Sequence, residues 1–135
     1  FMNPSDAMVR LNFPGGFPGD AVNKFEASGR NAKENDAFNF VKTIANFRKG
    51  SPALTKGTTT MFVPKDGYFV YFRKADNQTI MCVVNSNDKA QDVQFSDYAE
   101  LTNDFKGGKE VVTGYQVDTK FSIPAKQMWI IELNK

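Results

Sequence analysis

The sequence predicts a mainly β fold, an antiparallel β-sandwich preceded by a loop and one α-helix. Two observations lead to this expectation. From Gly57 onward, short runs of β-branched and aromatic residues alternate with turn residues at regular intervals, which is typical of an antiparallel sandwich. Residues 31–50 instead carry the hydrophobic pattern of a helix. Hydrophobic residues make up 41% of 135 residues, enough for a core without disulfide or metal staples.

Residues 1–30 follow neither the helical nor the strand period. Prolines and glycines interrupt the segment repeatedly, so most of it is expected to be loop, with Asp20 capping one short turn through Phe25. A structureless loop of this length is unusual inside a compact domain. It indicates either a functional segment or a missing neighbour.

The helix is expected to begin at a capping box formed by Asn31 and Glu34 and to end at Lys49-Gly50. Ser51-Pro52 then stops it, because a residue before proline disfavours the helical region. More than half of the helix circumference is apolar, whereas an ordinary surface helix has one apolar stripe. The helix is therefore expected to be buried on two sides, between two bodies. The apolar residues are Ala37, Phe38, Phe40, Val41, Ile44, Ala45 and Phe47.

The strands are predicted from period-two runs bounded by turn residues. The turn at 64–67 contains the hairpin signal Asp66-Gly67, and further turns are expected at 75–78 and 85–88. Ser96–Asn103 is expected to form a helical turn, and Gly107-Gly108 is expected to open another hairpin. The predicted strands are Thr58–Val63, Tyr68–Arg73, Thr79–Val84, Gln91–Phe95, Glu110–Thr113, Lys120–Ile123 and Met128–Leu133.

Composition excludes several functional classes. The chain has no His and one Cys, which removes the usual metal ligands and any internal disulfide, so we expect no metal and no cofactor. A net charge of +2 with scattered Lys and Arg argues against nucleic acid as a partner. No apolar run approaches the roughly 20 residues that span a bilayer. Cys82 shares a strand face with Ile80 and Val84, which favours core packing over a reactive thiol.

Two features of the N-terminal loop are candidate binding elements. Asp6 and Arg10 are four residues apart, and together they are able to accept and donate hydrogen bonds to sugar hydroxyls. The alternative, which spacing alone favours, is a surface ion pair worth at most about 1 kcal/mol. The stretch Phe13–Asp20 is not a phosphate loop, because no Gly-Lys-Ser/Thr follows. It either presents Phe13 or Phe17 as the rim of a cleft or, as we favour, packs on a neighbouring domain.

A third candidate is a platform of aromatic side chains for stacking sugar rings. Trp129 lies in an apolar run that resembles a buried terminal strand, so we expect it in the core. The tyrosines remain open as platform residues. They are Tyr68, Tyr71, Tyr98 and Tyr115.

Four stretches, in this order, resemble the C-terminal end of α-amylase-family glycoside hydrolases, especially the neopullulanase and cyclomaltodextrinase branch. Residues 6–10 are similar to the family's Asp-x-x-x-Arg loop after the last barrel strand. Residues 13–20 are similar to the branch's DFPGGWPGD loop, with Asn12 for Asp and Phe17 for Trp. Residues 47–54, followed by Gly57, resemble the exit of the last barrel helix. Val112-Thr113-Gly114 and residues 121–133 resemble the end of the β-sandwich C domain.

The resemblance implies that residues 1–54 are the loop and last helix of an incomplete (β/α)8 barrel and that residues 55–135 are the C-terminal sandwich. It also implies that Asp6 and Arg10 contact a glucose unit in the intact enzyme, where Asn12 and Phe17 depart from the usual loop. The catalytic carboxylates of that family lie on earlier barrel strands, so this chain is expected to hold no catalytic residue.

The first hypothesis is therefore a C-terminal fragment of an enzyme that cleaves α-1,4-glucans such as starch, maltodextrin, pullulan or cyclodextrin. Its sandwich would stabilise the barrel, which is its intramolecular partner, and the fragment alone would be inactive and would self-associate. An independent carbohydrate-binding module is the second hypothesis, and an adhesion or assembly sandwich is the third. For the intact enzyme we favour a secreted or periplasmic location, although one cysteine leaves the compartment undecided.

Overall fold

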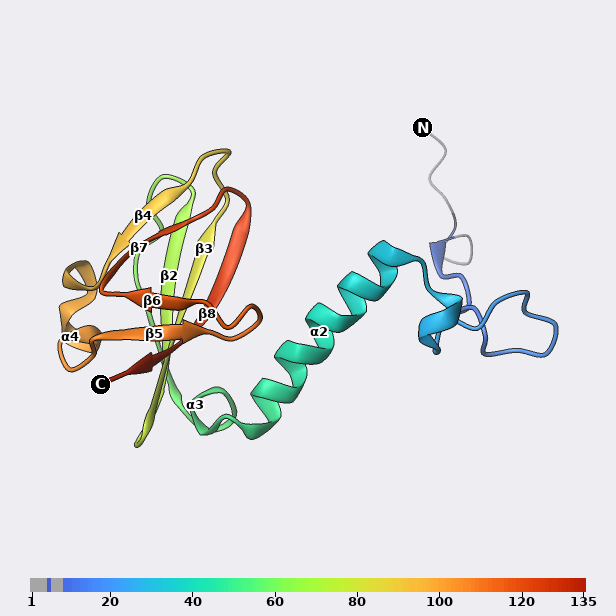
Figure 1. Cartoon of the computed structure of the whole chain (residues 1–135), viewed down its shortest axis with the longest axis horizontal. Helices are drawn as coiled ribbons and strands as arrows, with labels where there is room; N and C mark the ends of the chain where they lie inside the picture. The colour runs from blue at the N-terminus through green and yellow to red at the C-terminus, as the bar shows by residue number, and fades with distance from the viewer. Residues whose placement is uncertain (1–4, 6–8) are drawn as a thin grey trace. The chain divides into compact units, whose positions relative to one another are not determined.

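The computed structural model describes residue 5 and residues 9–135, which divide into two compact units (Figure 1). The first unit extends to Val41 and the second is Lys42–Lys135. In chain order the elements are η1 (Ala27–Gly29), α2 (Ala32–Gly50), α3 (Pro52–Thr55), β1 (Thr58–Met61), β2 (Tyr68–Ala75), β3 (Gln78–Asn85), β4 (Gln91–Gln94), η2 (Phe95–Tyr98), α4 (Ala99–Thr102), β5 (Gly107–Glu110), β6 (Gln116–Asp118), β7 (Lys120–Ile123) and β8 (Gln127–Asn134).

The strands of the second unit form two antiparallel sheets, which confirms the predicted β-sandwich. The larger sheet has the order β1-β2-β3-β8-β5-β6, and the smaller one pairs β4 with β7. The closing strand β8 lies between β3 and β5 (Figure 1), so the last residues of the chain hold the two halves of the larger sheet together. The predicted hairpin at Asp66-Gly67 is also confirmed, since both residues have positive φ, 51° and 74°, as the two-residue turn requires.

Alternation along β3 creates a core on each face of the larger sheet. Met81 and Val83 belong to the main core, which the smaller sheet, η2 and α4 close from the other side. Ile80 and Cys82 point to the opposite face and pack with Ala53 of α3. Cys82 is 2% exposed, and burial raises the pKa of its thiol, so its predicted role as a core residue is confirmed.

Helix α2 begins at the predicted capping box. The Asn31 side-chain oxygen accepts from the Glu34 N–H, and the Glu34 carboxylate accepts from the Asn31 N–H, both at 2.9 Å. The expected burial on two sides is not present within the described chain, because no residue of α2 is fully buried. Ile44 and Phe47 pack on the second core, and the apolar side chains earlier in the helix stay exposed.

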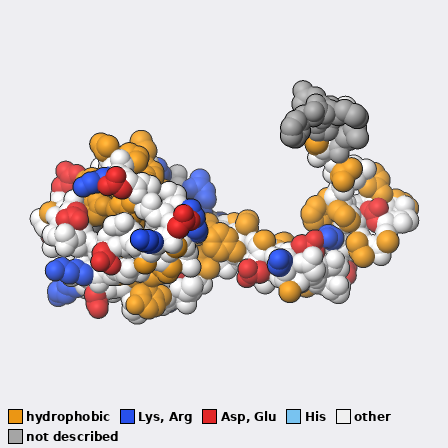
Figure 2. All heavy atoms as spheres, turned by 90° about the horizontal axis from the view of Figure 1, so that it is seen from above, with side chains coloured by type: hydrophobic (Ala, Val, Ile, Leu, Met, Phe, Trp, Pro, Cys, Tyr) orange, Lys and Arg blue, Asp and Glu red, His pale blue; other side chains and the backbone are white. Residues whose placement is uncertain are grey.

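Hydrophobic side chains also gather over the surface of the first unit (Figure 2). Among residues 9–41, which the structure describes, none is fully buried. The large exposed hydrophobic residues of this unit are Val9, Leu11, Phe13, Phe17, Val22, Phe25, Phe38, Phe40 and Val41.

Gly107-Gly108 does open a hairpin, since β5 pairs antiparallel with β6, but the two glycines lie within strand β5 and not in a turn before it. The predicted strand Glu110–Thr113 is therefore wrong, because residues 111–113 form the turn, and β6 was not predicted. Neither glycine has a positive φ. A Cβ at Gly107 would lie 2.3 Å from the Val117 carbonyl oxygen, and one at Gly108 would lie 2.6 Å from Cγ2 of Ile131. The glycines therefore serve close packing against neighbouring strands, which local sequence does not reveal.

The segment after α2 is fastened to the larger sheet by side chains. Nε of Arg73 donates to the Ala53 carbonyl at 3.2 Å, and the N-cap residue Ser51 is 1% exposed. The turn after β5 is organised by Glu110, whose buried carboxylate accepts from the N–H of Val112 at 3.0 Å and the N–H of Thr113 at 2.6 Å. Ala53 and Val111, which adjoin these polar contacts, both belong to the second core.

Candidate functional site

Asp20 stabilises the Gly/Pro loop of the first unit, residues 13–20, by hydrogen bonds to the loop backbone. Oδ2 of Asp20 accepts hydrogen bonds from the backbone N–H of Gly15 at 2.7 Å and of Phe17 at 3.0 Å. Gly15 has φ of 102°, and a Cβ there would lie 2.3 Å from Oδ1 of Asn23. The expectation that Asp20 caps a short turn through Phe25 is wrong, because its carboxylate accepts from N–H groups that precede it in the chain.

A small apolar cavity lies between this loop and the start of α2. Its volume is about 540 Å³. The rings of Phe13 and Phe25 meet edge to face with centroids 4.8 Å apart, and Phe38 and Ala37 come from α2. The lining residues are Phe13, Lys24, Phe25, Arg30, Glu34, Ala37 and Phe38.

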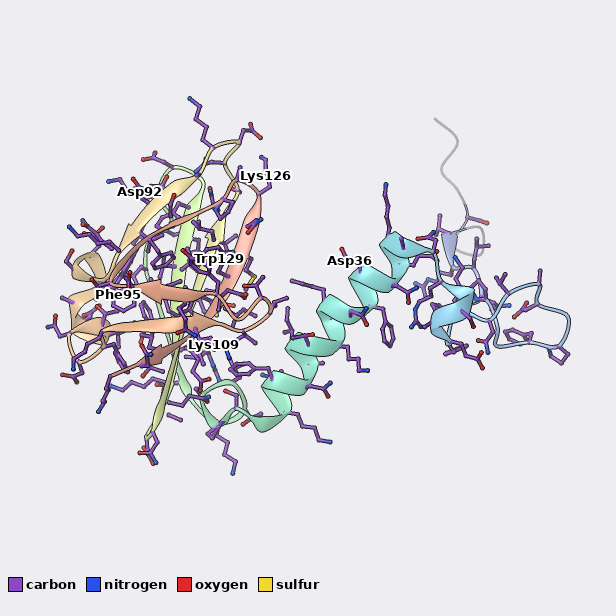
Figure 3. The ribbon with its side chains drawn as sticks, viewed as in Figure 1. Asp36, Asp92, Phe95, Lys109, Lys126 and Trp129 are labelled. Atoms are coloured by element: carbon purple, nitrogen blue, oxygen red, sulfur yellow. The ribbon has the colours of Figure 1, made fainter. Side chains whose placement is uncertain are left out.

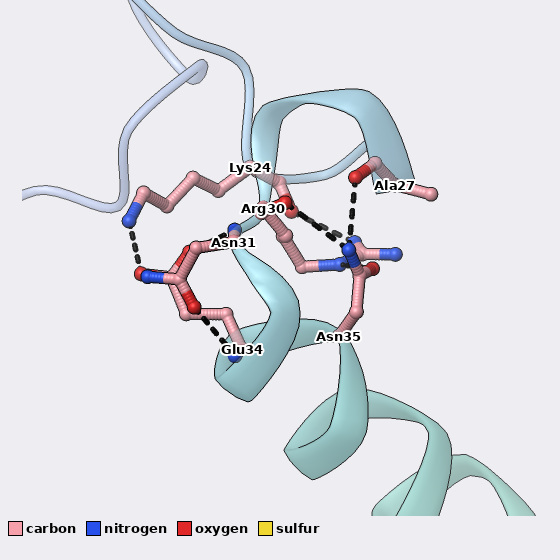
Figure 4. Close-up of polar contacts among 6 residues, drawn as sticks. All are labelled: Lys24, Ala27, Arg30, Asn31, Glu34 and Asn35. Carbon is pink, nitrogen blue, oxygen red and sulfur yellow. Dashed lines mark hydrogen bonds and ion pairs between the residues drawn. The ribbon is translucent and has the colours of Figure 1, made fainter.

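Lys24, Arg30 and Glu34, which line this cavity, also belong to a polar network (Figure 4). Arg30 donates to the carbonyls of Lys24 at 2.9 Å and Phe25 at 3.1 Å, and its Nε donates to Oδ1 of Asn35 at 2.9 Å. Its guanidinium carbon lies 3.9 Å from the centroid of the Phe38 ring, a cation–π contact. The network ties the loop to the first turns of α2.

Glu34 is the acidic residue of this network. It forms an ion pair with Lys24 and accepts from the Asn31 N–H. The Lys24 contact first, and then the Asn31 backbone bond, lower the pKa of the Glu34 carboxyl. Glu34 is therefore held as the carboxylate that both the capping box and the ion pair require.

The predicted site residues fall in different places. Asp6 lies outside the described residues, so its partnership with Arg10 stays a prediction; Arg10 is exposed. Phe13 and Phe17 are 55% and 57% exposed. Phe13 lines the cavity, whereas Phe17 is not among the residues that line it. Sequence reasoning missed Phe25, Arg30 and Phe38, which line the same cavity as Phe13, although Arg30 stands directly before the recognised capping box.

The candidate platform aromatics separate into three groups in the second unit. Trp129 stacks on Phe121 with an interplanar angle of 10° and contacts the exposed Tyr115. Trp129, which is labelled in Figure 3, packs on the main core but is only partly buried. The expected core position is therefore only partly confirmed. Tyr71 packs on the opposite face. Tyr68 and Tyr98 approach each other at one edge of the sandwich, with their hydroxyls 3.3 Å apart.

Metal and membrane features were also searched among the described residues. No cluster of three or more His, Cys, Asp or Glu side chains there is arranged to hold a metal ion. No helix in the described part of the chain is long and apolar enough to cross a membrane.

The sandwich matches a known protein family. The family model of the cyclo-malto-dextrinase C-terminal domain matches residues 59–132, more than half of the chain. The chain belongs to this family. The matched region of this cyclo-malto-dextrinase C-terminal domain runs from β1 to β8 and so covers both sheets. The resemblance to the end of α-amylase-family enzymes, drawn from the loop and closing-strand motifs, is confirmed.

Individual relatives agree with the family assignment. A cyclomaltodextrin glucanotransferase of Klebsiella oxytoca is 35% identical over 52 residues, which are 38% of this chain and 8% of that enzyme. A structure of AmyP in complex with maltotriose has a TM-score of 0.65 at 18% identity and covers 78% of this chain. An α-amylase from Geobacillus thermoleovorans, complexed with acarbose, has a TM-score of 0.60 at 20% identity and also covers 78%.

At these identities the two structures show a shared fold. This chain covers 22% of the AmyP chain and 24% of the Geobacillus chain. It therefore corresponds to about a quarter of these solved chains and to a smaller part of the glucanotransferase.

Proposed function

We propose that this chain is the C-terminal part of an α-amylase-family glycoside hydrolase that acts on α-1,4-glucans, and that its sandwich stabilises the catalytic barrel. The observation that carries the proposal is the family match over both sheets of the sandwich. The glucanotransferase relative and the solved structures with maltotriose and acarbose support an α-glucan over another polysaccharide. Starch, maltodextrin, pullulan and cyclodextrin all fit this class.

The first unit supports the barrel as the intramolecular partner. Its described residues bury no side chain fully, yet they expose nine large hydrophobic residues. The largest exposed apolar patches on soluble proteins commonly mark an interaction surface. In this proposal the barrel covers the loop and the first turns of α2, which gives the helix the second partner that its apolar circumference requires.

Within the intact enzyme, we assign Asp6 and Arg10 to contacts with a glucose unit, and Phe13 and Phe17 to the rim of the cleft. Two observations support this assignment. Arg10, Phe13 and Phe17 are exposed, and the Asp20 carboxylate stabilises the loop that carries Phe17 by accepting two backbone hydrogen bonds. Retaining hydrolysis of a glycosidic bond needs two carboxyl groups about 5–5.5 Å apart on a fixed scaffold. In the family these groups come from earlier barrel strands. The isolated chain is therefore proposed to be inactive.

Turnover by the isolated chain is the direct test. The purified chain should release no reducing sugar from soluble starch, pullulan or cyclodextrin, and measurable hydrolysis would contradict the proposal. Light scattering should show self-association through the uncovered first unit. Replacing Phe40 and Val41 by Ser should reduce this association, whereas Met61→Ser, at an exposed hydrophobic residue of β1, should not. A clean monomer that binds little hydrophobic dye would argue against an uncovered barrel-facing surface.

A further inference from the structure

The smaller sheet covers only part of the larger one and leaves a groove at the β1–β2 edge. This groove has a volume of about 560 Å³ and lies between the β1–β2 hairpin on one side and β4 with η2 on the other. All of its residues belong to the second unit. They are Phe62, Val63, Lys65, Asp66, Tyr68, Val70, Gln91, Asp92, Asp97 and Tyr98.

The floor of the groove is aromatic. The rings of Phe62 and Tyr98 meet edge to face with centroids 4.8 Å apart, and Val70 adds an aliphatic surface. The Tyr68 and Tyr98 hydroxyls form one hydrogen bond of 3.3 Å. Two hydroxyls carry two hydrogens and this bond uses one, so the other is available to a ligand. Burial raises the pKa of both phenols, Tyr68 and Tyr98, which therefore remain donors at neutral pH.

The rim of the groove is polar and mainly acidic. Gln91 and Asp92 come from β4 (Figure 3) and Asp97 from η2, opposite Lys65 and Asp66 of the hairpin. The rim thus carries three carboxylates and one ammonium group, so the groove repels anions such as phosphates and nucleic acid. Carboxylate oxygens accept hydrogen bonds strongly from neutral hydroxyl groups.

These properties match one kind of ligand. A pyranose ring has an apolar face of C–H groups, which fits an aromatic floor, and an edge of hydroxyls, which fits carboxylate and amide acceptors. Ligand sites in proteins commonly combine an apolar lining with a few polar groups in this way. We propose that the groove lined by Tyr68, Tyr98, Asp92 and Asp97 is a second α-glucan site, formed only by residues of the second unit. The choice of glucan rests on the proposed function.

The alternative location is the Trp129 cluster. There, Phe121 occupies a face of the Trp129 ring by stacking, and the indole N–H donates to Oε1 of Gln127 at 2.9 Å. One stacking face and the only polar hydrogen of Trp129 are therefore already used. Tyr115, 57% exposed, is the accessible ring of this cluster and provides a matched control.

The test is a calorimetric titration of the full chain with maltoheptaose, together with NMR shift mapping. Saturable binding is expected, with shifts at Tyr68, Gln91 and Asp92. Asp92→Asn and Asp97→Asn, both at exposed positions, should each weaken binding about tenfold, since they lose charged acceptors. Tyr68→Phe should weaken it while keeping the ring in place, and Tyr115→Ala should leave the affinity unchanged.

Three results would overturn the proposal. The first is the absence of saturable binding with both millimolar maltoheptaose and cellopentaose. This result would overturn the second site but leave the proposed function intact. The second is binding that Tyr115→Ala abolishes and Asp92→Asn does not change, which moves the site to the Trp129 cluster. The third is saturable binding of cellopentaose without maltoheptaose, which contradicts the α-glucan assignment of the whole protein as well.

Discussion

Oγ of Ser51 donates a hydrogen bond of 2.6 Å to Oε1 of Gln78, across 27 positions of the chain. The same Gln78 oxygen accepts from the Ala53 N–H at 3.1 Å, and its amide nitrogen donates to Oε1 of Glu132 at 2.6 Å. One side chain thus connects the start of α3 with strands β3 and β8. This connection makes the segment after the helix part of the sandwich.

Gln78→Ala should therefore lower the free energy of unfolding by about 1–3 kcal/mol, because the buried Ser51 hydroxyl and the Ala53 N–H lose their acceptor. Urea unfolding followed by circular dichroism measures the change. Asn77→Ala, at the adjacent exposed turn position, is the matched control and should cost much less. Equal losses in the two variants would contradict the role given to Gln78.

The stability of the domain should also depend on Glu110, even when the substitution keeps the size of the side chain. Its side chain is 1% exposed, and Oε2 also accepts from the Thr113 hydroxyl at 2.7 Å. Glu110→Gln replaces one acceptor oxygen by a donor group in a site that supplies only donors, so we expect a loss of about 1–3 kcal/mol. Glu100→Gln, at an exposed position of α4, should stay within about 0.5 kcal/mol. Thermal melts of both variants distinguish the two cases.

Gly108→Ala should destabilise the larger sheet. The added methyl group would meet Cγ2 of Ile131 at 2.6 Å and the Glu132 carbonyl oxygen at 2.7 Å, an overpacking that typically costs about 1–3 kcal/mol. Gly50→Ala provides the contrast, because nothing lies within 4 Å of a Cβ there. That variant should be neutral or stabilising by up to about 1 kcal/mol. A neutral Gly108→Ala in denaturant titrations would show that the strands separate easily.

The start of α2 should weaken in acid. The pKa of Glu34 is lowered in the folded chain, mainly by Lys24, so its contribution is present above the ordinary glutamate pKa. That contribution is lost as pH falls through the depressed pKa. Amide exchange of residues 31–35 should accelerate over this range, and Glu34→Gln should remove this pH dependence. A profile unchanged in Glu34→Gln would exclude the ion pair as its cause.

The expected boundary between 54 and 55 remains a prediction, and shortened chains test it. Residues 42–54 cluster with the sandwich, and Ile44, Phe47, Ala53 and Leu54 cover its second core. A chain of residues 42–135 should therefore unfold cooperatively at a higher temperature than one of residues 55–135. Equal melting temperatures would favour the boundary at 55.

Much of the fold follows from signals that are local in the sequence. The Asn31–Glu34 capping box and the Asp66-Gly67 turn depend on residues within four positions of each other, so they were predictable. Gly107-Gly108 has the composition of a turn, and only its approach to Val117 and Ile131 explains a strand. The same limit applies to the candidate sites: the Gly/Pro composition of residues 13–20 singled out Phe13, but its contact with Phe25 and the nearby Arg30 network arise from the folded loop.

The contact between Gln78 and Ser51 also bears on where this domain can be joined to another protein. The family match begins at residue 59, whereas the side chains that seal one face of the sheet begin at Ile44. A recombination event at the matched boundary would leave Ile80, Cys82 and Ile130 open to water. The segment needed to cover both faces of the sheet is therefore longer than the segment that the family match delimits, and we expect stable chimeras to carry the end of the donor's helix with its sandwich.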